Sequence, residues 1–160
     1  MQFDDSKTWL TPDAHRKLLA QLEHLTTEGR QAVVQRIAEA REHGDLRENA
    51  EYDTAKNDQG LMEAKIREIQ HVLDNCEVRD VEDSGAVEVG TVATVLDDDG
   101  DEMEVFLAPA ENKVPGLLLA SPVSPLGSAL LGARPGESVT YEAPGGKFTY
   151  KVVSVRVYAA

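Results

Sequence analysis

Two stretches of the chain carry mostly nonpolar residues at spacings of three and four, and this periodicity constrains the fold more than any other feature. Such spacing places the residues along one stripe of an α-helix and is typical of a coiled-coil seam. No proline follows Pro12 until well beyond both stretches, as long helices require. The first stripe comprises Leu18, Leu22, Leu25, Gly29, Val33, Ile37 and Ala40, and the second comprises Tyr52, Ala55, Gln59, Met62, Ile66, Ile69 and Leu73.

The two stripes fit one antiparallel registry. When they are paired in opposite directions, Ala40 lies opposite Tyr52 at one end and Leu18 lies opposite Leu73 at the other. The centre of this registry falls near residue 46, within Gly44-Asp45-Leu46-Arg47. The sequence therefore predicts a helical hairpin whose turn lies at these residues.

The helical region has a recognisable start. Thr11 precedes Pro12, and a capping hydroxyl followed by proline at the first helical position is a common way for a helix to begin. Beyond Cys76 the helical stripe ends, and residues 79–88 form an acidic stretch without helical periodicity. We expect the hairpin to occupy residues 1–78 and a linker to occupy residues 79–88.

The remaining residues, 89–160, have the pattern of strands. Residues 90–96 are rich in β-branched side chains, and Asp97-Asp98-Asp99-Gly100 is typical of a hairpin turn. Ser124 before Pro125 predicts the start of a short helix. Residues 147–158 carry nonpolar side chains at both parities, which predicts a bulge or burial on both faces. The chain is thus expected to be α+β, a helical hairpin followed by a small α+β domain.

Composition excludes several classes of function. The chain has 16 Lys and Arg against 29 Asp and Glu, a net charge of -13, which opposes general binding to a phosphate backbone. We therefore expect no specific recognition of duplex DNA. The single cysteine, Cys76, excludes an internal disulfide and suits a reducing compartment. No nonpolar run reaches the length of a membrane span, and the first residues do not resemble a signal peptide, so we expect a cytoplasmic protein.

Four acidic residues lie close to the expected turn: Glu42, Asp45, Glu48 and Glu51. Asp45 and Glu48 are three residues apart, so they can face the same side and bind a divalent cation that orients a water molecule. The same spacing also suits a capping box at the start of the second helix, and spacing alone leaves both interpretations open. Magnesium prefers about six oxygen ligands. A metal-binding tip would therefore need a partner to supply the remaining ligands.

The tip residues closely resemble a known motif. Residues 44–52 read Gly-Asp-Leu-Arg-Glu-Asn-Ala-Glu-Tyr, followed by Ala55-Lys56 and Gln59. This run resembles the tip of the bacterial transcript cleavage and elongation factors of the GreA/GreB family, and is closest to the GreA members. Residues 124–132, which read Ser-Pro-Leu-Gly-Ser-Ala-Leu-Leu-Gly, resemble the family's C-terminal FKBP-like domain. The resemblance covers nearly the whole chain in the right order.

The resemblance implies a factor that binds RNA polymerase and passes its coiled coil into the secondary channel. There it would stimulate cleavage of a backtracked RNA 3′ end, with Asp45 and Glu48 as the catalytic acids. These acids would hold Mg²⁺ jointly with the polymerase, so the chain would be an accessory factor and not an enzyme by itself. An alternative is a non-catalytic regulator that binds the same channel and inhibits the polymerase.

Further residues are candidates for contacts with RNA or polymerase. The basic residues nearest the tip are candidates for RNA contacts, although each also suits an ordinary solvated helix surface. They are Arg36, Arg41, Arg47 and Lys56. The resemblance places Ser124 and Pro125 on the surface that docks the polymerase, and helix capping explains the same two residues equally well. Two positions depart from the common family pattern: Arg47 replaces a small residue, and Val123 replaces Asn or Asp.

Overall fold

The structure is a computed structural model that describes residues 7–42 and 49–158. It divides into two compact units, and the division differs from the predicted boundaries. Of the described residues, 15–42 and 49–75 form the hairpin unit, whereas residues 7–14 group with residues 76–158. The predicted linker contributes to the second unit, because Val87 is fully buried in its core. The difference arises because this acidic stretch also contains nonpolar side chains, and their burial lowers the free energy of the folded protein.

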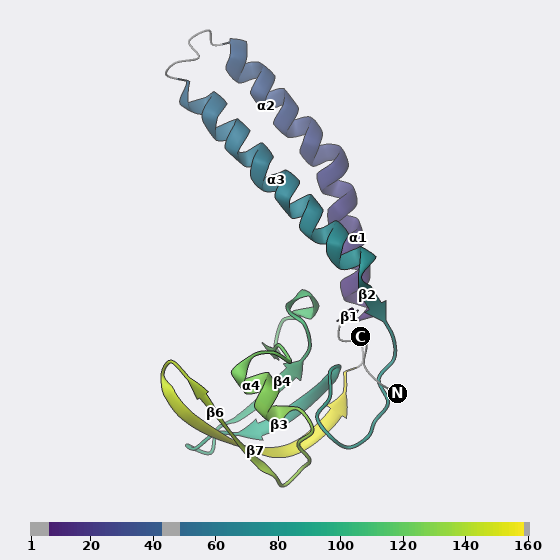
Figure 1. The fold of residues 1–160 in the computed structure, drawn as a ribbon, viewed down its shortest axis with the longest axis vertical. Coiled ribbons are helices and arrows are strands. Elements are labelled where there is room, and N and C mark those ends of the chain that lie inside the picture. The colour runs from purple at the N-terminus through teal and green to yellow at the C-terminus, as the bar shows by residue number, and fades with distance from the viewer. Residues whose placement is uncertain (1–6, 43–48, 159–160) are drawn as a thin grey trace. The chain divides into compact units, whose positions relative to one another are not determined.

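The hairpin unit consists of helices that follow the expected order. They are α1 (Pro12–His24), the π-helical segment η1 (Leu25–Gly29), α2 (Arg30–Glu42) and α3 (Ala50–Asp74). Thr11 provides the expected cap, because its Oγ1 accepts a hydrogen bond from the Ala14 N–H at 3.0 Å. Figure 1 shows α2 and α3 side by side. The 25 residues of α3 give it a length of about 37 Å.

The predicted seam is confirmed by burial. Every residue of both stripes is buried or half-buried, whereas nearly all residues between them are exposed. Val33, Ile37 and Ala55 form a core cluster with Tyr52 and Met62 packed against it. This burial of nonpolar side chains stabilises the hairpin, because most of the stability of a helix in a protein comes from packing of its nonpolar face and not from propensity.

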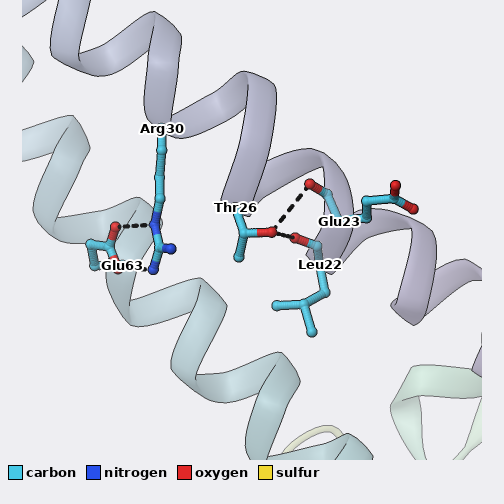
Figure 2. Close-up of polar contacts among 5 residues, drawn as sticks. All are labelled: Leu22, Glu23, Thr26, Arg30 and Glu63. Atoms are coloured by element: carbon cyan, nitrogen blue, oxygen red, sulfur yellow. Dashed lines mark hydrogen bonds and ion pairs between the residues drawn. The ribbon is translucent and has the colours of Figure 1, made fainter.

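The π-helical segment interrupts the first arm in its middle. The Arg30 N–H reaches back five residues to the Leu25 carbonyl, the bonding pattern of a π-helix. Figure 2 shows the Thr26 hydroxyl directed at the preceding turn, where it donates to the Leu22 carbonyl at 2.8 Å and the Glu23 carbonyl at 3.2 Å. The Thr27 hydroxyl also donates to the Glu23 carbonyl, at 2.7 Å. These hydroxyls provide donors to carbonyls at the point where the α-helical pattern breaks.

The spacing of the seam explains why a π segment is needed. The six intervals of the seam occupy 22 residues from Leu18 to Ala40, but only 21 from Tyr52 to Leu73. The second arm therefore follows the coiled-coil average of 3.5 residues per interval, whereas the first arm carries one residue in excess. A π turn accommodates one extra residue without rotating the rest of the helix away from its partner. The π segment thus keeps both halves of the first arm on the seam.

The second unit contains a short parallel pair and a five-stranded mixed sheet. The pair comprises β1 (Thr8–Leu10) and β2 (Cys76–Val78). The sheet has the order β5-β4-β3-β7-β6, with β4 and β5 parallel and all other neighbours antiparallel. Its strands are β3 (Thr91–Leu96), β4 (Glu102–Leu107), β5 (Leu118–Ala120), β6 (Ser138–Ala143) and β7 (Gly146–Val157). The 3₁₀ turn η2 (Ala110–Asn112) and helix α4 (Pro125–Leu130) complete the unit, and the predicted α+β class is confirmed.

Both faces of the central strands are covered. Ala93 and Val95 of β3 belong to one nonpolar cluster together with Leu130 of α4. Val92 belongs to a second cluster that contains Trp9, and alternation along the strand explains this division. The predicted irregularity in the last strand is a bulge, because the register between β3 and β7 shifts opposite Thr94 and Val95.

A buried asparagine fixes the N-terminal segment to this unit. The side chain of Asn112 is 1% exposed, and its Oδ1 accepts the Thr11 N–H at 2.8 Å. Its Nδ2 donates to the Trp9 carbonyl at 2.9 Å and to the Pro109 carbonyl at 3.1 Å. Buried polar groups destabilise a fold unless they are hydrogen-bonded. The Asn112 side chain provides these bonds for backbone groups of two segments that are distant in sequence.

Candidate site at the hairpin tip

The two predicted catalytic acids, Asp45 and Glu48, lie outside the described residues, as does Arg47. The described residues nearest to them are Glu42, the last residue of α2, and Asn49, which precedes α3. The site can therefore be built from the ends of the two arms. The roles of the acids and of Arg47 remain predictions.

Asn49 joins the two arms at this end of the hairpin. Its Oδ1 accepts the Tyr52 N–H at 3.0 Å, which caps the N-terminus of α3. Its Nδ2 donates to the carbonyl of Ala40 in the last turn of α2. One side chain of the motif thus bonds to backbone groups on both arms.

The predicted RNA-contacting cations that the structure describes all contact other residues of the hairpin. Arg36 pairs with Asp58 of α3, with Nη2 and Oδ2 2.9 Å apart. The guanidinium of Arg41 lies over the Tyr52 ring, with Cζ 5.7 Å from the ring centroid, within the range of a cation–π contact. These contacts cross from one arm to the other and give the residues a structural role in the hairpin.

Lys56 differs from the two arginines because its contact stays within one helix. Its Nζ donates to Oε1 of Gln59 at 3.2 Å, one turn further along α3. The side chains of all three cations remain exposed, so solvent can replace these contacts at low cost. Their predicted contacts with RNA are compatible with this exposure and remain untested.

A second interhelical ion pair lies beside the π segment. The Nε and Nη2 atoms of Arg30 each donate to a different carboxylate oxygen of Glu63 at 2.9 Å, which is the bidentate geometry that arginine favours (Figure 2). The hydrogen bonds from Arg30 hold the pKa of Glu63 below its usual value, and those to Glu63 raise the pKa of Arg30.

Arg30 follows seam residue Gly29, whereas Arg36 precedes seam residue Ile37. Helical periodicity therefore places the two interhelical ion pairs on opposite sides of the seam.

A shallow hollow of about 400 Å³ lies between the ends of α2 and α3. It is open to solvent and mixes two carboxylates with one guanidinium, so it lacks the enclosed nonpolar walls typical of a cofactor pocket. Its lining residues are Arg36, Glu39, Ala40, Ala50, Glu51 and Thr54.

Among the residues that the structure describes, one group of three acids brings its carboxylates close together. The group comprises Asp97, Asp99 and Asp101, whose ligand atoms lie within 4.8 Å of one another. The turn itself explains Asp97, because its Oδ1 accepts the N–H groups of Asp99 at 2.9 Å and Asp101 at 2.8 Å. This geometry confirms the predicted hairpin turn, and exposed acids of this kind are common without a metal ion.

Ser124 and Pro125 occupy the start of α4 as predicted. The Ser124 Oγ accepts the Gly127 N–H at 3.0 Å and donates to the Ser121 carbonyl at 2.6 Å. This capping role is confirmed, and docking remains a prediction that is compatible with it. Val123 immediately before them is 92% exposed, an unusual position for a nonpolar side chain.

Sequence reasoning missed three features. The second bond of Asn49 has no signal in local sequence, because its acceptor lies nine residues away. Asn112 bonds across more than 100 residues. The π segment did have a signal, namely the excess residue in the first stripe of the seam.

Comparisons with known proteins agree with this architecture. A family model described as "Transcription elongation factor, N-terminal" matches residues 8–78. A second, described as "Transcription elongation factor, GreA/GreB, C-term", matches residues 82–157. Among the residues that the structure describes, no helix combines the length and hydropathy needed to cross a membrane.

Individual relatives extend over nearly the whole chain. The transcription elongation factor GreA of Saccharopolyspora erythraea is 45% identical, and the match covers 93% of each chain. GreA of Streptomyces avermitilis is 38% identical, and the match covers 98% of each chain. A solved structure, that of GreA factor homolog 1 from Thermus thermophilus, is 27% identical with a TM-score of 0.43, over 94% of this chain and 99% of that one. On the matches of the two family models and these full-length relatives, the chain belongs to the GreA/GreB family of transcription elongation factors.

Proposed function

We propose that this protein is a transcript cleavage factor. In this proposal it binds RNA polymerase, inserts its hairpin into the secondary channel and stimulates cleavage of the backtracked RNA 3′ end. Asp45 and Glu48 are the residues that act at the reaction centre. The protein supplies these acids to the polymerase and is not an enzyme by itself.

The observation that carries the proposal is the position of the motif in the hairpin. The seam confirms two long antiparallel arms, and Asn49, which belongs to the motif, bonds across them. The chain enters and leaves the hairpin unit at the opposite end, at residues 15 and 75. A hairpin of this length can carry its acids about 35 Å or more from that end, a distance suited to reaching a site within another molecule.

The chemistry follows from what two carboxylates can and cannot do. Two carboxylates supply too few oxygens for the roughly six ligands that magnesium prefers, so we expect them to bind it weakly unless a partner completes the shell. Magnesium bound there would stabilise a leaving oxygen and lower the pKa of an attacking water. The residues of the chain would orient that water and its proton, and the interhelical contacts would keep the arms rigid enough to do so.

Basic residues along the arms would offset the charge of -13 near an RNA chain. Arg36, Arg41 and Lys56 are exposed and hold their positive charges close to the tip. Arg47 belongs to the same group by sequence. Ser124 and Pro125 would contribute to docking on the polymerase through the surface at the start of α4.

The test is RNA cleavage in a backtracked elongation complex with magnesium. The wild-type protein should shorten the RNA, and Asp45→Asn and Glu48→Gln should each abolish this while leaving binding to polymerase nearly unchanged. Glu42→Gln is the matched control, because it removes a nearby carboxylate outside the proposed pair and should leave cleavage intact.

The alternative function gives a different result in the same assay. A non-catalytic regulator would slow nucleotide addition on complexes that have not backtracked and would shorten no RNA. Cleavage that persists unchanged in both tip variants would refute the proposed roles of Asp45 and Glu48.

A further inference from the structure

We propose that Asn49 is a positioning residue for the tip acids, because its side chain ties the end of α2 to the start of α3. This inference rests on the proposed function. It assigns Asn49 no contact with substrate or metal.

The Asn49 side chain makes two bonds that do different things. The bond from the Tyr52 N–H to Oδ1 is a helix cap and acts within α3 alone. The bond from Nδ2 to the Ala40 carbonyl crosses to the other arm. An amide carries its donor and its acceptor on separate atoms, whereas a serine hydroxyl carries both on one oxygen that lies one bond closer to the backbone than the amide nitrogen. Ser and Asp cap helices about as well as Asn, so capping alone does not require asparagine at this position.

We call the hydrogen bond from Asn49 Nδ2 to the Ala40 carbonyl the tie. It joins two residues that flank the acids in sequence, one on each side. Ala40 is 3% exposed and lies on the seam, so its carbonyl is held in a packed part of α2. The bond joins two residues that are nine positions apart in the sequence. Closing a short stretch at both ends reduces its conformational freedom before any partner binds, and lowers the entropic cost of placing its side chains.

Neighbouring contacts strengthen the same junction. The Asp53 N–H donates to the Asn49 carbonyl at 3.2 Å, which continues the first turn of α3. The cation–π contact of Arg41 with Tyr52 also joins the arms at this level. Neither contact uses the Asn49 side chain, so a substitution at this residue can remove the bond to Ala40 by itself.

Substitutions at residue 49 separate the two bonds. Asn49→Asp keeps an acceptor for the Tyr52 N–H but has no donor for the Ala40 carbonyl. Asn49→Ser also keeps the acceptor, but its only donor is the capping oxygen itself, one bond short of the position of the amide nitrogen. Asn49→Ala loses both bonds. The assay measures cleavage in a backtracked complex at saturating factor, together with the dissociation constant for polymerase. We expect Asn49→Asp and Asn49→Ser to lower the maximal rate about tenfold, as slight misplacement of reacting groups does. The dissociation constant should stay within about twofold, because the docking surface is unchanged.

Asn75→Asp is the matched control. It removes an amide-to-carbonyl bond of the same kind, from Asn75 Nδ2 to the His71 carbonyl at 2.8 Å, at the other end of α3. Its cleavage rate should equal that of the wild type. If Asn49→Asp and Asn49→Ser cleave at the wild-type rate and only Asn49→Ala is slow, Asn49 merely caps α3 and the proposal is wrong.

A measurement without polymerase distinguishes failure of this inference from failure of the proposed function. Backbone order parameters from NMR relaxation should fall at Glu42 and Ala50 in Asn49→Asp and stay unchanged in the middle of α3. Unchanged order parameters would show that the tie does not hold the junction, and would overturn the inference. If the order parameters fall in Asn49→Asp but the wild-type protein cleaves no RNA, the bond does hold the two arms together and the proposed function is wrong.

Discussion

Deletion of Thr27 should be tolerated by the hairpin. It removes one residue from the π segment, so that the six seam intervals of each arm would occupy the same number of residues. Every seam position of the first arm then falls within about half a residue of the heptad average. The segment can relax to an α-helix without rotating either half of the arm off the seam.

The expected change in the free energy of opening the hairpin follows from the hydrogen bonds that the deletion removes and restores. The deletion removes the hydrogen bond from the Thr27 hydroxyl to the Glu23 carbonyl, which contributes about 0.5–1.5 kcal/mol. It restores regular helical hydrogen bonds in the same turn, which offset a similar amount. The free energy of opening the hairpin should therefore stay within about 1 kcal/mol of the wild type.

Deletion of Gly60 in α3 is the matched control. It also removes one residue near the middle of the hairpin, but it widens the mismatch between the arms from one residue to two. Part of α3 must then rotate by about 100° relative to α2. Such a rotation takes a residue such as Ile66, which is 2% exposed, out of the seam. We expect a loss of about 2–5 kcal/mol, the usual cost of removing a large side chain from a core.

Amide hydrogen exchange at Ile37 and Ile66 in the full chain measures these free energies. The two residues report on opposite arms, and exchange in the hairpin is read separately from that in the second unit. If deletion of Thr27 weakens protection as much as deletion of Gly60, the π segment does not correct the register and our explanation of it is wrong.

Three further predictions concern single side chains. Asn112→Ala should cost about 2–4 kcal/mol in urea unfolding, because it leaves buried backbone groups of the N-terminal segment unbonded; a loss below about 0.5 kcal/mol would contradict this. Because Arg30 lowers the pKa of Glu63, the pair stabilises the hairpin above the ordinary carboxyl pKa, and this contribution is lost as the pH falls through the lowered value. An NMR titration should show the pKa of Glu63 return to its ordinary value in Arg30→Gln. Gly127→Ala should lower the melting temperature, since its Cβ would lie 1.9 Å from the Ser121 carbonyl oxygen; an unchanged value would refute the close approach.

Local and periodic signals made much of the fold predictable from sequence. The seam follows from helical spacing, and the cap at Thr11 and the start of α4 at Ser124 follow from short motifs. The bulge in β7 followed from nonpolar residues at both parities. Each of these features depends on residues a few positions apart, so one segment contains the whole signal.

Features that depend on distant partners could not be predicted. Trp9 packs edge to face against Phe106, with ring centroids 6.4 Å apart, and this places β1 in the second unit. The acidic neighbours of Val87 predict a linker, although the Val87 side chain itself is buried. At the candidate site, the motif and its acids can be read directly from the residues, whereas the bond from Asn49 to Ala40 depends on the geometry of both arms.

The magnesium dependence of RNA cleavage tests the central claim most directly. The cleavage rate in a backtracked complex is measured at saturating factor over a range of magnesium concentrations, for the wild type and for Glu48→Gln. If the tip acids complete a magnesium site that the polymerase begins, loss of one carboxylate should raise the half-saturating magnesium concentration about tenfold or more and lower the maximal rate. Superimposable curves for the two proteins would contradict the claim.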